Sequence, residues 1–423
     1  MTDRILRSPE ALPKACLSLS RKVFPEIVKL RRQLHQYPEL AFQEINTGKL
    51  IAQELSKLDI RVKKGVGKTG LVGILKGNGN AGVVALRADM DALPITEESG
   101  VPFTSKNIGK MHACGHDAHM AMLIGAAKIL SQLKNEIRGT VKFIFQPSEE
   151  KNPGGAPSMI KDGALSDPDV DVIFGQHITA DIPAGKFGFR AGPLLASADE
   201  IYFTVIGKGG HGAKPHETID PILIAAQIIT SLQSVISRMR DPLEPSVLTI
   251  GSIHGGTAPN VIPDSVKLSG TLRTMNEVWR KKALGLIKRT AEDCAKSFGG
   301  KCKVEVSHGY PVLVNSEKET EQARSSAESL FGKSSFLTVP PVMGAEDFAY
   351  FLQKVPGTFW WIGAGNKKIG TAASIHNSKF KIDETAMMYG SAFLAYLTIE
   401  YLSQRSRRTP SEDPFGKQRE RSR

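Results

Sequence analysis

The stretch Val83-Val84-Ala85-Leu86-Arg87 is a short apolar run that ends in a charge, and two similar runs follow at residues 141–145 and 170–174. Runs of this length are typical of buried strands. Between the first two, residues 120–133 place apolar side chains at helical spacing. Strands that alternate with helices predict the α/β class, with a mainly parallel sheet.

The pattern changes near Gly192-Pro193. Residues 200–206 alternate as a half-exposed strand does. A helix at 221–240, strands near 247–253 and 266–273, and a helix at 278–298 are expected to follow. Two helices with a small antiparallel sheet indicate an α+β domain.

After residue 308 the α/β pattern returns, with Thr358–Ile362 as a buried strand. A chain of 423 residues is long enough for two or three domains. We therefore expect one domain made of residues 1–193 and 309–403, an inserted domain at 194–308, and a tail at 404–423.

The composition is that of a globular protein, with 41% hydrophobic and 23% charged residues. No apolar run approaches the roughly 20 residues of a membrane helix. The basic N-terminus is interrupted by prolines and has no apolar signal core after it. A cytoplasmic location and no membrane partner are therefore expected.

The formal net charge of +12 raises the question of an anionic partner. Residues 405–423 contain seven basic and three acidic side chains, so this segment alone contributes +4. Its near lack of apolar residues predicts a disordered, solvated tail. Binding of nucleic acid or acidic surfaces through the tail is the alternative, as a secondary role.

Four cysteines are too few for a disulfide scaffold. Cys294 and Cys302 lie close enough along the chain to be bridged across Gly299-Gly300. In a cytosol, free thiols are the expectation.

The segment Met111-His-Ala-Cys-Gly-His-Asp-Ala-His119 contains five metal-capable side chains. Thiolate, imidazole and carboxylate are the ligands that Zn²⁺ and similar cations prefer. Open α/β sheets bind small molecules and ions beyond the carboxyl ends of their strands. Ionisable residues that follow strands are therefore also candidates for this site. These residues are Asp89, Asp91, Glu149, Glu150, His177 and His376.

Each of these residues alone has a structural explanation: a hydrogen-bonded histidine, a solvated glutamate pair or a core cysteine. Their joint placement at one edge of the sheet predicts a metal site. For the adjacent carboxylates Glu149 and Glu150, one is expected to bind metal and the other to act as a base towards water. The residues themselves leave open which glutamate does which.

At these positions the chain resembles the aminoacylase and carboxypeptidase family of dinuclear metallo-amidohydrolases. The most similar branch contains hippurate hydrolase, auxin-conjugate hydrolases and archaeal thermostable carboxypeptidases. The resemblance runs from about Arg31 to Leu402. Its motifs are residues 34–40, 87–95, 111–117, 145–150, 209–216, 260–263, 344–348 and His376-Asn377.

The resemblance implies a zinc-exopeptidase-like catalytic domain and an inserted lid and dimerisation domain. It implies that two divalent ions per chain (Zn²⁺, Mn²⁺ or Co²⁺) are bound by Cys114, His116, Glu150, His177 and His376. It makes Glu149 the general base, and it gives His211 an oxyanion-stabilising role in a partner subunit's site. Asn260 and Arg273 match positions that hold the substrate.

For some of these residues the sequence itself leaves alternatives open. The Gly207–Gly212 segment lacks the ending of a phosphate loop, so nucleotide binding is not expected. His211 is equally compatible with a structured turn, and Arg273 with a strand-surface charge. The wider family has a His-x-Asp pair where this chain has Arg87, Asp89 and Asp91, so Asp89 is expected to support ligands rather than to bind metal. Met120 replaces a small hydroxyl residue of the branch.

The expected activity is hydrolysis of the amide bond of N-acyl amino acids, or release of the C-terminal residue of short N-blocked peptides, by a metal-activated water. Glu149 would take the proton of this water and pass it to the leaving amine. Amidine or ester hydrolysis is the competing enzyme class. A homodimer or higher homo-oligomer is expected, and a nucleic-acid partner is not.

Overall fold

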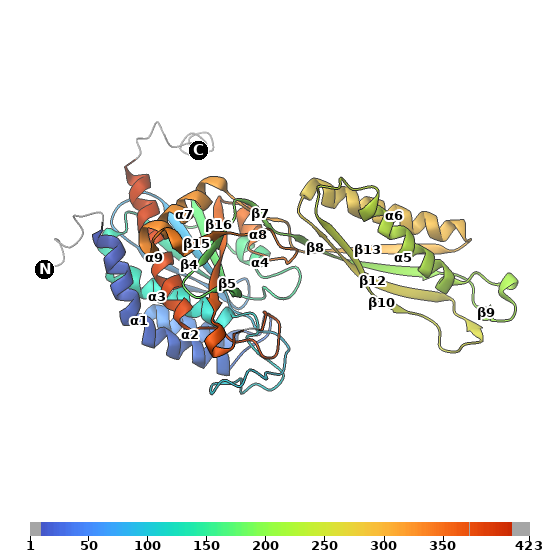
Figure 1. The fold of residues 1–423 in the computed structure, drawn as a ribbon, viewed down its shortest axis with the longest axis horizontal. Coiled ribbons are helices and arrows are strands. Elements are labelled where there is room, and N and C mark those ends of the chain that lie inside the picture. The colour runs from blue at the N-terminus through green and yellow to red at the C-terminus, as the bar shows by residue number, and fades with distance from the viewer. Residues whose placement is uncertain (1–9, 372, 408–423) are drawn as a thin grey trace. The chain divides into compact units, whose positions relative to one another are not determined.

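The computed structural model describes residues 10–371 and 373–407, which form two compact units (Figure 1). Within this part of the chain, the first unit comprises residues 10–192, 315–339 and 350–407. The second comprises 193–314 and 340–349. No sequence pattern predicted that segment 340–349 belongs to the second unit. The inserted domain at 194–308 stays a prediction.

The first unit contains an eight-stranded sheet with the order β1-β2-β4-β3-β5-β16-β6-β15. Its four central strands β4, β3, β5 and β16 are parallel neighbours, which confirms the predicted mainly parallel α/β class. β1, β2 and β6 are antiparallel to their inner neighbours. The strands are β1 Arg61–Val66, β2 Gly70–Lys76, β3 Val83–Asp89, β4 Thr140–Gln146, β5 Val172–Pro183, β6 Phe187–Phe189, β15 Phe336–Thr338 and β16 Gly357–Gly365.

Helices pack on this sheet, and α1, α3 and α9 also pack on one another. The helix predicted from the apolar spacing at 120–133 is α3. The helices are α1 Ala11–Gln36, α2 Ile45–Ser56, α3 His116–Gln132, α4 Ala156–Lys161, α7 Glu317–Phe331, α8 Ala349–Leu352 and α9 Thr385–Ser406. Short 3₁₀ turns span Lys134–Glu136, Pro215–Glu217, Lys333–Ser335 and Lys367–Ile369.

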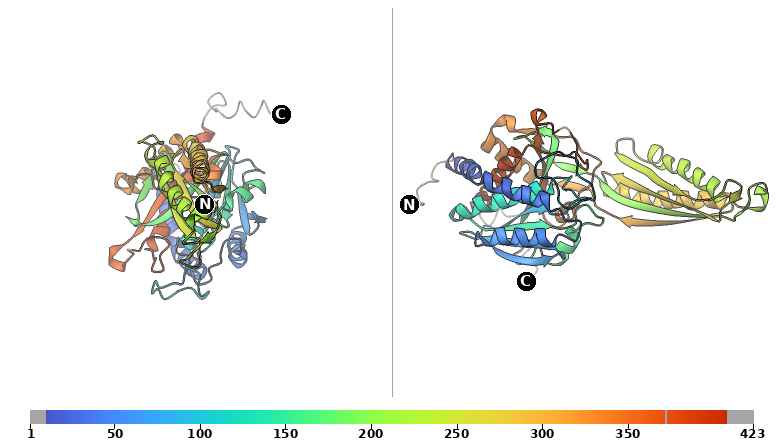
Figure 2. Two further views of the ribbon diagram at one scale, coloured as in Figure 1. Left: turned by 90° about the vertical axis from the view of Figure 1, so that its right-hand side faces the viewer. Right: turned by 90° about the horizontal axis from the view of Figure 1, so that it is seen from below.

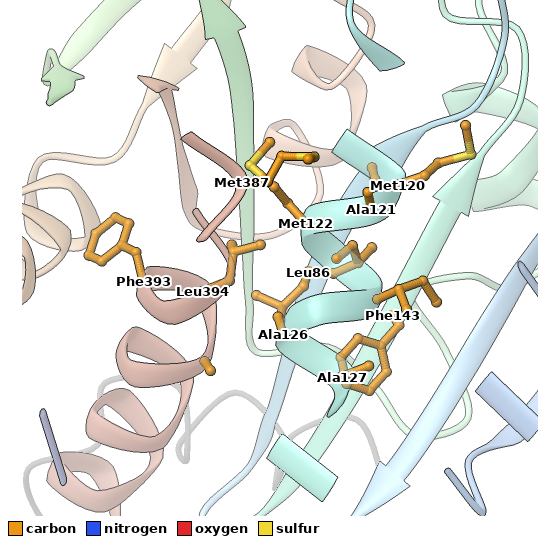
Figure 3. Packing of buried hydrophobic residues seen from close by; sticks show 14 of the residues in the cluster. Leu86, Met120, Ala121, Met122, Ala126, Ala127, Phe143, Met387, Phe393 and Leu394 are labelled. Atoms are coloured by element: carbon orange, nitrogen blue, oxygen red, sulfur yellow. The ribbon is translucent and has the colours of Figure 1, made fainter. Parts of the chain in front are cut away.

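Helix α3 is buried along almost its whole length, because it lies between the sheet and helices α1 and α9. Figure 3 shows its side chains Met120 and Met122 among the apolar residues of β3, β4 and α9. Met120 is fully buried, so its role is helix packing. Gly125 allows α3 to approach α9 closely, since a Cβ there would lie 2.3 Å from Ser391 Oγ. The deep position of α3 fixes its N-terminus near the sheet.

The second unit contains a four-stranded antiparallel sheet with the order β10-β12-β8-β13. Helices α5 and α6 pack together on this sheet, α5 on β10 and β12 and α6 on β12 and β13 (Figures 1 and 2). Asp220 and Asn276 cap the two helices, since each side chain accepts backbone N–H groups of the first turn. The elements are β7 Gly192–Leu195, β8 Ser197–Ile206, β9 Gly210–His211, α5 Pro221–Ser237, β10 Ser246–His254, β11 Val261–Ile262, β12 Ser265–Thr274, α6 Glu277–Ser297, β13 Lys301–His308 and β14 Leu313–Asn315.

The structure bears on two further expectations, the start of the tail and the state of the cysteines. The tail predicted at 404–423 starts too early, because residues 404–406 continue helix α9; residues 408–423 lie outside the described residues. All four cysteines are free, as expected. Among the described helices, none has the length and apolar character needed to cross a bilayer.

Candidate metal centre

The carboxyl ends of β3, β4 and β5 meet at one edge of the large sheet. Asp89 pairs with Gln146 in the parallel register of β3 and β4. Arg87 pairs with Gly175, and this register brings His177 of β5 level with Asp89 of β3. β5 continues to Pro183, so His177 lies inside a strand rather than after one. Side chains far apart in the sequence therefore converge at this edge of the sheet, although His177 does not follow a strand as predicted.

The convergence produces overlapping groups of side chains whose ligand atoms lie within 4.8 Å of one another. Three of these groups are Cys114 with His116 and His177, Cys114 with Glu150 and His376, and His116 with Glu149 and Glu150. Cys114, His116 and His177 are buried, whereas His376 is half-exposed. The first unit thus brings together all five ligands expected from the sequence, with Glu149 beside them.

Individual distances show how compact this arrangement is. Cys114 Sγ lies 3.4 Å from His177 Nε2, and Glu150 Oε1 lies 3.2 Å from His376 Nε2. The Nε2 atom of His116 is 3.8 Å from the same Glu150 oxygen. Donor atoms at these separations can share ligation of cations whose bonds are about 2.0–2.3 Å long.

Gly115 sets the geometry of Cys114 and His116. It precedes the first residue of α3 with φ 89°, a conformation that L-residues with a Cβ rarely adopt. A Cβ at this position would also lie 2.4 Å from Ile178 Cγ2. The glycine therefore lets the chain turn tightly before α3, so that the side chains on either side of it enter the same group.

The hydrogen bonds of two histidines leave their Nε2 atoms facing this group. His116 Nδ1 donates to the backbone oxygen of Asp91 at 2.9 Å, and His177 Nδ1 donates to the backbone oxygen of Ile178 at 2.7 Å. The buried Nε2 of His116 has no hydrogen-bond partner among the described residues. A backbone acceptor on one ring nitrogen, with the other nitrogen left for a cation, is the usual pattern of a metal-bound histidine.

The electrostatics favour a cation at the same place. Burial opposes a charge on His116, yet the carboxylates of Asp89 and Asp91 raise its pKa to about 10. Burial and the nearby Glu150 and Glu149 carboxylates raise the pKa of the Cys114 thiol well above its ordinary value. A thiolate can form there only if positive charge compensates it. The donor set therefore fits divalent cations.

Asp89 and His119 form a further such group with His116, but their own polar atoms are already hydrogen-bonded. His119 Nε2 accepts the backbone N–H of Ile178 at 2.9 Å, so its Nδ1 carries the proton and donates to Asp89 Oδ1 at 2.6 Å. Arg87 Nη1 donates to the other Asp89 oxygen at 2.7 Å. Although burial opposes ionisation, positive charge at His116 and Arg87 and the hydrogen bond from His119 hold the pKa of Asp89 well below its usual range. Both side chains have their polar atoms engaged in these hydrogen bonds.

Asp91 has a role that its position after β3 did not reveal. Its Oδ1 accepts the backbone N–H of Glu149 and its Oδ2 accepts that of Glu150, each at 2.9 Å. One buried carboxylate thus fixes the backbone of both adjacent glutamates. Its position soon after a buried strand marked Asp91 as a candidate site residue. Its hydrogen-bond partners could not be predicted, because they depend on the register of β3 and β4.

The other members of the 111–119 segment do not all contribute ligand atoms. Asp117 is buried and accepts hydrogen bonds from Arg31 Nε and His35 Nδ1, each at 2.8 Å. Positive charge at Arg31 and His35 lowers the pKa of Asp117, although burial opposes this. Of these metal-capable side chains, Cys114 and His116 are among the five expected ligands. Asp117 instead connects α3 to α1 through its hydrogen bonds.

The remaining residues expected from the sequence belong to the second unit. His211 is exposed on β9, and Asn260 lies beside it, because Gly212 donates its backbone N–H to the Asn260 oxygen at 2.8 Å. His211 Nδ1 accepts the backbone N–H of Ala213 at 3.0 Å. Arg273 lies on β12, opposite Ala198 of β8. The second unit therefore places His211 next to Asn260.

Comparisons with known proteins agree with this geometry. Residues 85–400 match the family described as peptidase family M20/M25/M40. The chain is 42% identical to thermostable carboxypeptidase 1 of Saccharolobus solfataricus over 90% of this chain and 96% of that protein. It is 41% identical to the Arabidopsis thaliana protein IAA-amino acid hydrolase ILR1-like 2, over 92% and 88% of the two chains.

A solved structure extends the comparison to the fold. The Bacillus subtilis YXEP protein, described as a dinuclear metal-binding peptidase from the M20 family, superposes with a TM-score of 0.79 at 35% identity. The match covers 90% of this chain and 99% of that one. The alternative of a nucleic-acid or surface-binding role finds no support among these relatives.

Proposed function

Because the chain belongs to peptidase family M20/M25/M40 and is a metal-dependent hydrolase of amide or peptide bonds, we propose how its own residues carry out this reaction. The substrate is an N-acyl amino acid or a short N-blocked peptide, and the product is an amino acid with a free carboxylate. The observation that carries the proposal is the convergence of the Cys114, His116 and His177 group with Glu149 and Glu150 at one edge of the sheet.

In this proposal the ligands of two divalent cations are Cys114, His116, Glu150, His177 and His376. The thiolate favours Zn²⁺ or Co²⁺, whereas the imidazole and carboxylate ligands also accept Mn²⁺. When bound, the cations supply Lewis-acid polarisation of the scissile carbonyl and acidify a water molecule.

Glu149 is the general base. Glu150 has an oxygen 3.2 Å from His376 and 3.8 Å from His116, which supports a ligand role for Glu150 and leaves the neighbouring carboxylate for proton transfer. The Glu149 carboxylate takes a proton as water oxygen bonds to the carbonyl carbon. It then delivers that proton to the amide nitrogen as the C–N bond breaks, so the products are a carboxylic acid and a free amine.

Residues of the second unit complete the site in a homodimer or larger homo-oligomer. Because His211 Nδ1 accepts an N–H group, its Nε2 carries a proton and can donate to the developing oxyanion of a partner subunit's substrate. Asn260, next to His211, would bind the substrate as well. The guanidinium of Arg273 suits a terminal carboxylate, which it can bind through two parallel hydrogen bonds.

The test is amino-acid release from a panel of N-acetyl, N-benzoyl and N-indoleacetyl amino acids and N-blocked dipeptides. The protein is stripped with a chelator and reloaded separately with Zn²⁺, Mn²⁺ or Co²⁺. Metal-restored release is the expected result, and matched esters and amidines determine whether amides are preferred. Metal binding without release from any amide would contradict the proposed substrate class.

A further inference from the structure

Glu44 is a buried carboxylate to which the proposed mechanism gives no task. It lies just before α2 and is inaccessible to solvent. Its Oε1 accepts the backbone N–H of Ser148 at 2.8 Å, and its Oε2 accepts the Thr69 hydroxyl at 2.6 Å. Glu44 therefore connects the turn between β1 and β2 to the segment that contains Glu149.

The backbone of Ser148 is held in an unusual conformation. Its φ of 55° lies in the left-handed region, which side chains with a Cβ adopt only when surrounding contacts impose it. Pro147, the preceding residue, is tightly enclosed by two glycines. A Cβ on Gly70 would lie 2.7 Å from Pro147 Cδ, and a Cβ on Gly155 would lie 1.9 Å from the Pro147 oxygen. The direction in which the chain leaves Ser148 determines where Glu149 begins.

Three consecutive backbone N–H groups of this segment are bound by two carboxylates. Glu44 accepts the one from Ser148, and Asp91 accepts those from Glu149 and Glu150. Without Glu44, the buried N–H of Ser148 would lose the partner that holds its left-handed conformation. Asp91 alone would then fix the following two residues.

We infer that Glu44 is a positioning residue for Glu149, acting through the backbone of Ser148. This inference rests on the proposed function of Glu149 as the base. It also predicts an effect on metal binding, because Glu150 follows in the same segment. Among the described residues, Glu44 belongs to none of the groups that could hold a metal ion, and we expect its effect to depend on hydrogen bonding rather than on its charge.

The test compares Glu44→Gln with Glu44→Leu. In Glu44→Gln the amide oxygen accepts the Ser148 N–H and the amide nitrogen donates to the Thr69 hydroxyl, so both contacts persist. Its kcat is expected to stay within about threefold of the wild-type value. In Glu44→Leu both contacts are lost, and kcat is expected to fall about 10–100-fold with little change in KM, as for other residues that orient a metal site.

Zinc affinity, measured by competition with a chromophoric chelator, is the readout that does not depend on turnover. It is expected to fall about tenfold in Glu44→Leu and to be retained in Glu44→Gln. Thr69→Val is the matched control, since it removes only the Thr69 contact and leaves the bond to Ser148. A purely structural role would lower the melting temperature of Glu44→Leu without changing kcat or zinc affinity at 25 °C.

Folded Glu44→Leu with wild-type kcat and zinc affinity would overturn the inference, and so would equal damage in Glu44→Gln. If Glu44→Leu does not fold, Glu44→Asp gives the same test, because its shorter side chain cannot reach both partners; wild-type values for it would also overturn the inference. Failure of the proposed function can be distinguished from failure of this inference. In the first case the wild-type protein releases no amino acid, and the zinc affinities of the variants still decide the role of Glu44.

Discussion

The carboxylate of Asp91 and the backbone N–H of Glu149 are joined by a 2.9 Å hydrogen bond, and the second oxygen of Asp91 binds the next N–H along the chain. Asp91, which follows the end of β3, therefore fixes the segment after β4. This link explains how two adjacent glutamates can hold different positions around one cation-binding group.

Asp91→Asn is expected to weaken catalysis and metal binding together. An asparagine amide has one oxygen, so its nitrogen would face one of the two backbone donors and could not accept from it. By the usual cost of disturbing residues that orient metal ligands, kcat and zinc affinity should each fall about 10–100-fold. Steady-state kinetics and chelator competition measure the two effects.

Asp171→Asn is the control for that substitution. Asp171 Oδ2 accepts the N–H of Val83 at 2.8 Å and Oδ1 accepts from Arg405, at the opposite end of β3. It should lose stability while it keeps kcat and zinc affinity. Equal losses of kcat in the two variants would mean that Asp91 acts only through overall stability.

Gly115→Ala is expected to destabilise the protein and to prevent correct placement of Cys114 and His116. The new Cβ would combine a left-handed φ of 89° with a 2.4 Å approach to Ile178, at a cost on the order of 3 kcal/mol. Gly285→Ala in α6 is the matched control, because its Cβ would enter open space and helix propensity should stabilise it by about 1 kcal/mol. Denaturant unfolding distinguishes the two; similar effects would contradict this explanation.

Lys142 gives a prediction for the pH dependence of stability. It is almost fully buried, and burial lowers its pKa to about 8, although its Nζ donates to the backbone oxygens of Ala164 and Ser166. Since an unfolded lysine titrates near 10.4, the unfolded chain binds more protons between these two pH values. The lysine's contribution to the free energy of unfolding should therefore rise with pH across this window, by up to roughly 3 kcal/mol.

The measurement is denaturant unfolding of the wild-type protein and Lys142→Met at several pH values between 7.5 and 10. The difference in free energy of unfolding between the two proteins should change in favour of the wild type as the pH rises. A difference that does not vary with pH would show that Lys142 titrates at its ordinary value in the folded state.

The periodicity of the sequence was sufficient for most of the architecture. Apolar runs at 83–87 and 141–145 lie within β3 and β4, and the helical spacing at 221–240 corresponds to α5 with an error of three residues at its end. These segments are long or strongly apolar, so local pattern and tertiary environment agree. The predicted start of the tail was wrong. Residues 404–406 belong to helix α9, although this segment has little apolar character.

The candidate site was partly accessible to sequence reasoning. Strand ends and side-chain chemistry predicted that the residues of the metal site would lie close together, but His177 lies inside β5 rather than after a strand. The sequence did not reveal the structural role of Asp117, because its partners Arg31 and His35 are more than 80 residues away. Glu44 gave no signal at all, since its partner Ser148 is 104 residues further along the chain.

The most direct test of the central claim is to measure metal content and amino-acid release in parallel for the wild-type protein and Glu149→Gln. We predict that both proteins bind two divalent ions per chain. Release by the variant should be about 10²–10⁴-fold slower at saturating substrate, the range usually lost with a general base. Near-wild-type release by Glu149→Gln with both ions bound would contradict the account.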